Sequence, residues 1–175
     1  VDHLIVVVRD LNKAIIDYKK ILGISPCWKG KHSELGTINA VFNLENIYLE
    51  LLSPGSRGPG TEFINSLLDK KGDHLAGIAL GTDNIELVKE TLNKEGHEVD
   101  ITSGEAISEE EGSIRRWKNI FLPISLSREL FIFIIEHTEG SFTEYEYEDI
   151  SRVKKLDHVV TVSYTHLRAH ETIDD

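Results

Sequence analysis

The stretch Gly30–Pro54, GKHSELGTINAVFNLENIYLELLSP, contains two apolar runs separated by a short turn. Side chains alternate between the two faces of a strand, so Glu50 in the run IYLELL has apolar neighbours on either face. A buried carboxylate costs several kcal/mol unless a cation or a hydrogen-bonding group meets it. The sequence therefore predicts a partner for Glu50, and the metal or arginine that supplies it is left open at this point.

The residues around this stretch predict a unit with the order β-α-β-β-β. Val1–Val8 is a β-branched run typical of a buried strand. Asp10 is a natural N-cap for the amphipathic helix that follows, and Gly23 is a natural C-cap. Three further strands are predicted, at residues 25–31, 37–44 and 47–52.

The same order begins again after a linker at residues 54–73 that contains a short predicted helix, 61–71. His74–Leu80 predicts a strand, Asp83 an N-cap, and Gly96 the end of the second helix. A shift of 73 residues places Asp10 on Asp83 and Gly23 on Gly96. Strands at 97–102, 117–122 and 131–136, with an acidic loop at 103–112, complete a second module. The duplication predicts two modules, residues 1–53 and 74–137.

A third copy of the opening strand follows this pair. Lys155–Val162, KLDHVVTV, repeats the Asp-His sequence of Val1–Val8. We therefore expect one domain at 1–137, then a spacer and the first strand of an incomplete further module at 138–162. Residues 163–175 fit no part of the pattern, and we interpret them as a non-native tail that is excluded from the fold.

Composition restricts the classes of partner. The net charge of −11 disfavours nucleic acids and anionic membranes, because both repel an acidic protein. No apolar run approaches the roughly 20 residues of a membrane span. The single cysteine, Cys27, excludes an internal disulfide and is typical of a reducing compartment. We expect a cytoplasmic protein whose partner is a small-molecule ligand.

Several motifs, in the order found here, resemble the vicinal-oxygen-chelate superfamily and its glyoxalase-like domain subgroup. That superfamily includes glyoxalase I, extradiol dioxygenases and bleomycin-resistance proteins. The resemblance implies an α+β fold in which paired βαβββ modules form a curved mixed sheet around a ligand pocket. It rests on Gly30, His32, Gly36, Thr37 and Asn39, on Tyr48–Leu52, on Ala79–Asn84, on Arg115–Trp117, and on Phe131–His137.

The resemblance also implies a divalent metal, Zn²⁺, Ni²⁺, Mn²⁺ or Fe²⁺, held by imidazole and carboxylate groups. Carried over by position, the ligands are His3, Glu50 and Glu136. The usual histidine of the second module is replaced by Ala76 or Gly77, so His74 is the candidate for a displaced fourth ligand. A His3 that only forms hydrogen bonds at a strand entry, without a metal, is an equal alternative.

The predicted catalytic groups are Glu50 and Glu136 as bases and His32 in acid–base chemistry. The predicted substrate-binding residues are His32, Thr37, Asn39, Tyr48, Arg116 and Trp117. The leading interpretation is an enzyme of the lyase, isomerase or dioxygenase type that acts on a small oxygen-rich molecule by Lewis-acid catalysis. The alternative is a metal-free binding protein of the drug-sequestering kind. A homodimer is compatible with either, because related proteins assemble modules within or between chains.

Overall fold

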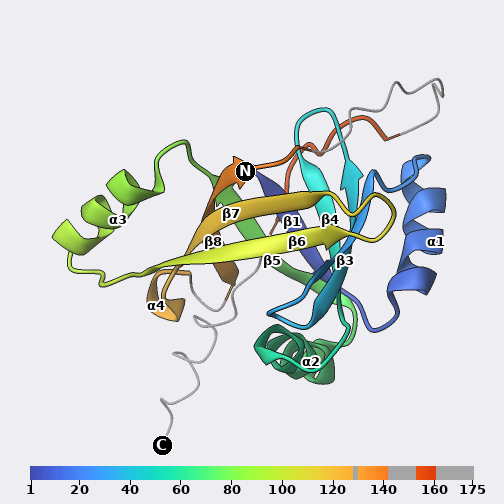
Figure 1. Ribbon diagram of the computed structural model, residues 1–175, viewed down its shortest axis with the longest axis horizontal. Coiled ribbons are helices and arrows are strands. Elements are labelled where there is room, and N and C mark those ends of the chain that lie inside the picture. The colour runs from blue at the N-terminus through green and yellow to red at the C-terminus, as the bar shows by residue number, and fades with distance from the viewer. Residues whose placement is uncertain (128–129, 142–152, 161–175) are drawn as a thin grey trace, which may run out of the picture.

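The computed structural model describes residues 1–127, 130–141 and 153–160. In this part of the chain, eight strands close into a barrel in the order β1-β4-β3-β2-β6-β7-β8-β5 (Figure 1). Helices α1, α2 and α3 lie outside the barrel, at well separated positions around it. The paired-module α+β architecture expected from the sequence is confirmed, and both modules come from one chain.

The first module follows the predicted order, with small shifts in the ends of its elements. Asp10 caps the first helix by accepting a hydrogen bond from Lys13 N at 3.0 Å, and Gly23 ends it with φ = 69°, a left-handed conformation that suits glycine. The first and last strands pair in parallel, with Ile5 beside Glu50. The elements are β1 (His3–Val7), α1 (Leu11–Leu22), β2 (Trp28–His32), β3 (Thr37–Asn43) and β4 (Tyr48–Pro54).

The second module repeats this arrangement. Its first strand joins β1 antiparallel and its own last strand in parallel, and the barrel closes where the second strand meets β2. A connecting helix, α2 (Pro59–Lys71), precedes it. The module consists of β5 (His74–Gly81), α3 (Ile85–Lys94), β6 (Ile101–Ser108), β7 (Ile114–Phe121), α4 (Ile124–Ser127) and β8 (Phe131–Glu139).

Three local predictions for the second module are wrong. In the predicted strand 97–102, residues 97–100 are outside any strand, because β6 begins at Ile101. The N-cap of α3 is Asn84 rather than Asp83, and its side-chain oxygen accepts a hydrogen bond from Leu87 N at 3.0 Å. Most of the predicted acidic loop at 103–112 belongs to β6. Gly104 lies in this strand because the indole of Trp117 packs over its backbone. A β-carbon at this position would come within 2.4 Å of Trp117 Nε1, so the close approach requires glycine.

The segment 153–160 lies against the first module. Val153 N donates to Leu22 O at 2.8 Å, and the Asn46 amide makes two hydrogen bonds with the backbone of Leu156. The described part of the predicted strand Lys155–Val162, residues 155–160, is not in a strand. A closed barrel explains this, because each of its strands already has two neighbours and offers no free edge. The predicted tail at 163–175 falls outside the described residues.

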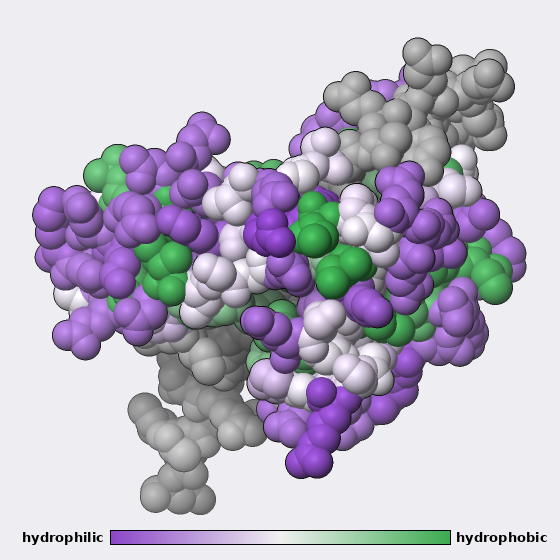
Figure 2. Space-filling model, viewed as in Figure 1, coloured by the Kyte–Doolittle hydropathy of each residue, from purple (hydrophilic) through white to green (hydrophobic). Residues whose placement is uncertain are grey.

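Alternation along the strands separates an outer core from the barrel interior. Leu4, Val6 and Phe42 pack outward in a cluster that includes Ala14 and Ile15 of α1. Side chains on the opposite faces of the strands point into the barrel. The face shown in Figure 2 is mostly hydrophilic, with small apolar patches. No helix in the described part of the chain has the length and apolarity needed to cross a membrane.

Candidate active site

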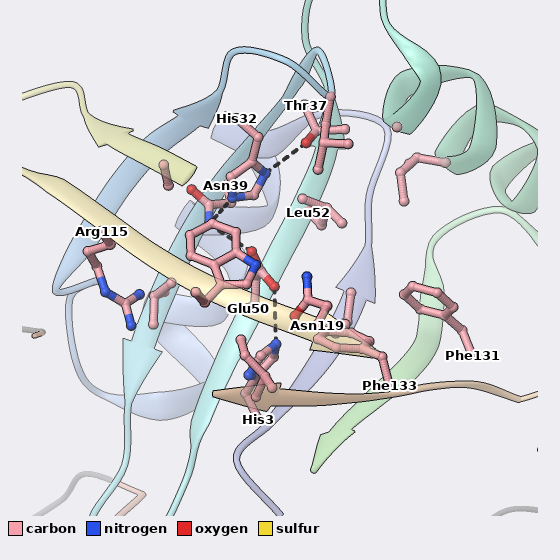
Figure 3. A pocket seen from close by; sticks show the side chains of 18 of the residues that line it. His3, His32, Thr37, Asn39, Glu50, Leu52, Arg115, Asn119, Phe131 and Phe133 are labelled. Carbon is pink, nitrogen blue, oxygen red and sulfur yellow. Dashed lines mark hydrogen bonds and ion pairs between the residues drawn. The ribbon is translucent and has the colours of Figure 1, made fainter. Parts of the chain in front are cut away.

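A cavity of about 300 Å³ lies inside the barrel. Its walls are the inward-facing side chains of β1, β2, β3, β4, β6, β7 and β8, together with part of α2. Figure 3 shows Glu50 near the middle of this space, between Arg115 on one side and Phe131 on the other. Seven residues predicted from the sequence line it, and these are His3, His32, Thr37, Asn39, Tyr48, Glu50 and Trp117.

Glu50 has two partners in the cavity wall. Asn39 Nδ2 donates to Glu50 Oε1 at 2.7 Å, and His3 Nε2 lies 3.5 Å from Glu50 Oε2 (Figure 3). Glu50 is only 8% exposed, and of these two contacts the one with Asn39, whose amide donates a hydrogen bond, offsets the cost of burying its charge. The first is a short charge-assisted hydrogen bond, whereas the second is longer than a strong one. The oxygen facing His3 is therefore the less firmly held of the two.

His32 extends this network as a neutral imidazole. Its Nδ1 lies 2.8 Å from Thr37 Oγ1, and Asn39 Nδ2 lies 3.4 Å from its Nε2. Because an amide nitrogen only donates, Nε2 is the acceptor and Nδ1 carries the proton. Burial lowers the pKa of His32, and the positive charge of Arg115 lowers it further, against the opposing influence of Glu50. This pKa shift agrees with the neutral tautomer.

Asp2 connects the two modules through a pair of histidines. It lies 2.6 Å from His3 Nδ1 and 3.2 Å from His137 Nε2, while Arg115 Nη2 lies 3.3 Å from His137 Nδ1. Arginine only donates, so His137 accepts at Nδ1 and donates to Asp2 from Nε2. Burial alone would raise the pKa of Asp2, but the hydrogen bonds from His137 and His3 hold it well below its usual value.

Asp2 therefore determines which nitrogen of His3 faces the cavity. The Asp2 carboxylate accepts a hydrogen bond from Nδ1, and Nε2 points toward Glu50. The ring of Tyr48 stacks on His3 with centroids 4.4 Å apart, which fixes the plane of the imidazole. Burial raises the pKa of Tyr48, and the negative charges of Asp2 and Glu50 raise it further, so its hydroxyl group stays protonated.

The remaining wall is aromatic. Phe121 stacks on Phe131 at 5.8 Å between centroids, and Phe133 lies 5.4 Å from Phe131. Phe63 of α2 packs against Phe131 at 5.1 Å. Trp117 meets the imidazole of His32 edge-on at 5.6 Å and so joins the aromatic wall to the polar network. Such rings offer a large apolar surface to a ligand.

The structure places Glu136 outside the cavity, contrary to its expected position. Glu136 Oε2 accepts a hydrogen bond from Ile85 N at 2.7 Å, at the N-terminus of α3. The inward-facing residues of β8 are Phe131, Phe133, Ile135 and His137. Neighbouring residues of a strand face opposite sides of the sheet. Glu136, which was chosen by its position in the family pattern, therefore lies on the outer face, while its neighbours Ile135 and His137 face the cavity. Glu136 therefore binds the N-terminus of α3 and faces away from the cavity.

His74 and Arg116 are also displaced from their expected places. His74 Nδ1 bonds to Gly72 O at 2.7 Å, and its side chain does not line the cavity. Arg116 points outward and pairs with Glu105 and Glu139 on the surface. Alternation along β7 places its neighbour Arg115 on the inner face instead. That alternation, counted back from Trp117, was the signal that could have identified Arg115.

The expected metal site is not assembled by these residues. Of the four predicted ligands, only His3 and Glu50 lie side by side. Within the described residues, no three histidine, cysteine, aspartate or glutamate side chains form a group that could hold a metal ion. Ala76, which takes the place of the usual histidine, is buried in the core. The predicted four-residue ligand set does not fit a metal ion.

The family model for the glyoxalase-like domain matches residues 1–173. The chain belongs to the glyoxalase-like domain family. This result agrees with the motifs found in the sequence, because the matched region includes both modules. The sequence matches no curated protein.

Solved structures with the same fold include two epimerases. Methylmalonyl-CoA epimerase from Mycobacterium tuberculosis is 20% identical, with a TM-score of 0.60 over 79% of this chain and 87% of that chain. A methylmalonyl-CoA epimerase in complex with methylmalonyl-CoA and NH4+ is 20% identical, with a TM-score of 0.58 over 78% of this chain and 92% of that chain. A hypothetical protein from Bacillus halodurans is 21% identical, with a TM-score of 0.62 over 81% and 96%. At these identities the likeness is one of fold.

Proposed function

We propose that this glyoxalase-like protein is an enzyme that moves a proton on a small oxygen-bearing organic molecule, with Glu50 as the base. The observation that carries the proposal is the Glu50 carboxylate, which is buried in the middle of a cavity that has an aromatic wall. One oxygen is held by Asn39 and the other faces His3 Nε2. Keeping a carboxylate in this setting costs free energy, and general-base catalysis is a function that requires it.

The chemistry follows from these positions. Glu50 Oε2 removes a proton from a carbon next to a carbonyl group. The electron pair of the C–H bond forms a C=C bond, and the π electrons of the carbonyl group move onto its oxygen. His3, held at Nδ1 by Asp2, directs Nε2 toward the same space and can exchange a proton with Glu50 or with that oxygen. Return of the proton to the other face of the carbon, or to a neighbouring atom, completes an isomerisation.

The similar structures suggest a substrate with which to test this reaction, but they do not assign the reaction to this protein. Two of them are methylmalonyl-CoA epimerases, and an epimerisation next to a carbonyl group is a proton transfer of this kind. Their likeness to this chain is one of fold, so the proposal rests on the residues of the cavity. Methylmalonyl-CoA is therefore one member of the substrate panel.

The family resemblance implies a divalent metal, but no step of this mechanism is routed through one. His3 and Glu50 are the residues of the predicted set that lie together, and Glu136 and His74 lie elsewhere. Metal analysis of the purified protein tests this point. A stoichiometric divalent ion that is present in the wild type and lost in Glu50→Gln would favour the Lewis-acid mechanism over metal-free proton transfer.

The aromatic wall supports a second candidate, a binding protein that holds its ligand without turnover. Trp117, Phe131 and Phe133 present apolar surface suited to sequestering a small molecule, as expected for the drug-binding alternative. This candidate needs the cavity but assigns no chemical step to Glu50. The two candidates are therefore separated by turnover and by the response to Glu50→Gln.

The test is hydrogen–deuterium exchange at carbon, followed by NMR in D₂O. The panel contains methylmalonyl-CoA, 2-oxo acids and hydroxyketones, with wild-type protein, Glu50→Gln, and Glu136→Gln as the matched control. Exchange with the wild type and the control, reduced at least roughly 100-fold in Glu50→Gln, is the expected result. Binding without exchange would favour the second candidate, and exchange that survives in Glu50→Gln would contradict the role of the base.

A further inference from the structure

Glu50 is a buried carboxylate without an arginine or lysine partner among the residues that the structure describes. Its side-chain contacts are with Asn39 and His3, and no arginine or lysine in this part of the chain forms an ion pair with it. The amide of Asn39 carries no charge, and Arg115 contacts His137 instead, at 3.3 Å. A buried charge without a counter-charge is strongly unfavourable, so the cavity keeps a negative site that a ligand can neutralise.

His3 places a second hydrogen-bond acceptor at the same point. Its Nδ1 lies 2.6 Å from Asp2, which holds the proton on that nitrogen and leaves a lone pair on Nε2. A protonated Nε2 would approach a carboxylate oxygen to about 2.7–2.9 Å, whereas Nε2 lies 3.5 Å from Glu50 Oε2. Two acceptors therefore face each other across a gap (Figure 3). A ligand group with at least two N–H donors satisfies both of them.

The other charges of the cavity wall do not reverse the sign of this site. Asp2 adds a second carboxylate behind the imidazole ring. Arg115 is already engaged, with its guanidinium carbon 5.8 Å from the centre of the Trp28 ring in addition to its contact on β8. His32 is neutral, because its burial lowers its pKa. Two carboxylates against one guanidinium favour a cation over an anion at the gap.

Aromatic rings surround the route from this gap to the surface. Phe133 meets the ring of His3 edge-on with centroids 5.6 Å apart, and Phe131 follows at 5.4 Å from Phe133. Phe63 and Phe121 continue the cluster and are 41% and 47% exposed. The faces of such rings attract cations, and their apolar surface is released from water when another ring covers it.

The size of the cavity limits the ligand. An apolar cavity of roughly 150 Å³ is known to hold benzene, and this cavity has about 300 Å³. One aromatic ring with a short chain therefore fits inside.

We propose that this cavity binds a primary amine in its ammonium form, carried on a short chain that ends in an aromatic ring. The ammonium group donates to Glu50 Oε2 and His3 Nε2 and supplies the positive charge that the described residues do not. The ring lies along the phenylalanine cluster. This inference does not rest on the proposed function, and for a binding protein such an amine is the bound cargo.

The probes are ω-phenylalkylamines from benzylamine to 4-phenylbutylamine, with the alcohol of each length as the uncharged counterpart. Binding is measured by calorimetry at pH 7.5 on protein treated with EDTA and dialysed. The amine of the best length is expected to bind at least about tenfold more tightly than its alcohol, because hydrogen bonds to a charged group are the stronger ones. Equal or tighter binding of the alcohol at every length would overturn the proposal. Binding of Zn²⁺ without binding of any amine would also overturn it, in favour of a metal ion.

The aromatic part of the site is tested with propylamine. It keeps the ammonium group of 3-phenylpropylamine and lacks the ring. It is expected to bind at least about tenfold more weakly, because it buries far less apolar surface. Equal affinity of the two amines would overturn the place of the ring.

Two variants locate the ammonium group. Glu50→Gln keeps the shape of the side chain and removes its charge, so the amine is expected to lose at least about tenfold in affinity while the alcohol changes by less than about twofold. Glu136→Gln is the matched control, because it removes the same charge from the outer face of β8. Unchanged amine affinity in Glu50→Gln, or an equal loss in Glu136→Gln, would contradict the proposal. The comparison of amine with alcohol on the wild type keeps the test decisive if Glu50→Gln does not fold.

Proton exchange separates this inference from the proposed function. Both place a ligand at Glu50 Oε2, so a bound amine is expected to inhibit exchange competitively, with an inhibition constant equal to its dissociation constant. Exchange that continues at saturating amine would overturn the assigned position. Amine binding with no exchange on any substrate supports this inference alone, and exchange with no amine binding supports the proposed function alone.

Discussion

The last strands of the two modules, β4 and β8, have the same place in the fold and different roles. Each pairs in parallel with the first strand of its own module, β4 with β1 and β8 with β5. Each also carries a glutamate among apolar residues. Glu50 faces the cavity, whereas Glu136 faces outward and meets the N-terminus of α3. Duplication preserved the backbone, and a one-residue difference in phase decided which carboxylate can meet a ligand.

The same division extends to the rest of the modules. The first supplies the hydrogen-bonded network of His32, Asn39 and Glu50, and the second supplies most of the aromatic wall. Arg115, Asn119 and His137 are the polar exceptions in the second module, and Asp2 connects His137 to the first. Two similar modules thus provide a chemical half and a packing half of one cavity.

The largest expected effect is on the chemical half. Glu50→Gln should lower the rate of carbon-bound proton exchange by roughly 10²- to 10⁴-fold, because it removes the base while keeping its shape. Single-turnover exchange in D₂O measures the change, and urea unfolding checks that the fold is retained. A variant with wild-type exchange would show that the two carboxylates do not differ in the way proposed.

The packing half is expected to respond in stability. Phe133→Ala deletes a buried ring and should lower the free energy of unfolding by about 3–5 kcal/mol. Phe63→Ala, at the exposed rim of the same cluster, is the control and should cost clearly less. Urea unfolding of both variants gives the comparison. Equal losses would mean that Phe133 is not part of a packed core.

The polar network is expected to make stability depend on pH. Burial lowers the pKa of His32 in the folded state relative to about 6.5 in the unfolded chain, so below that pH the unfolded state binds more protons. The contribution of His32 to stability is complete above about pH 6.5 and declines as the pH falls. Urea unfolding at pH 7.5, 6.5 and 5.5 should show a smaller decline in His32→Gln. Parallel curves for the two proteins would contradict a buried neutral imidazole.

The smallest effect is expected at the outward glutamate. Glu136→Gln can still accept the hydrogen bond from Ile85 N, but it loses the favourable charge at a helix N-terminus, worth about 0.3–1 kcal/mol. Thermal unfolding at low salt measures this loss, and proton exchange should be unchanged. A large loss of exchange with intact stability would place Glu136 in the reaction and remove the contrast with Glu50.

Much of the polar half of the site was predictable from local sequence. Tyr48 and Glu50 were placed by simple alternation, whereas Trp117 and the hydrogen-bonding residues around the turn at Gly36 were recognised by their motifs. Arg115, His137 and Asp2 were missed as a connected set. They come from three separate strands or strand ends, and no spacing in the sequence reports that they meet.

The sequence by itself determined the repeat, the order of the elements and the expensive position of Glu50, because strand alternation, helix caps and burial act over a few residues. Tertiary structure alone decided the partner of that carboxylate. Pairing of β4 with β3 and β1 brought Asn39 and His3 to Glu50, and a shift in phase on β8 turned Glu136 away. Contacts across a closed barrel depend on the register of several strands at once, which no single segment encodes.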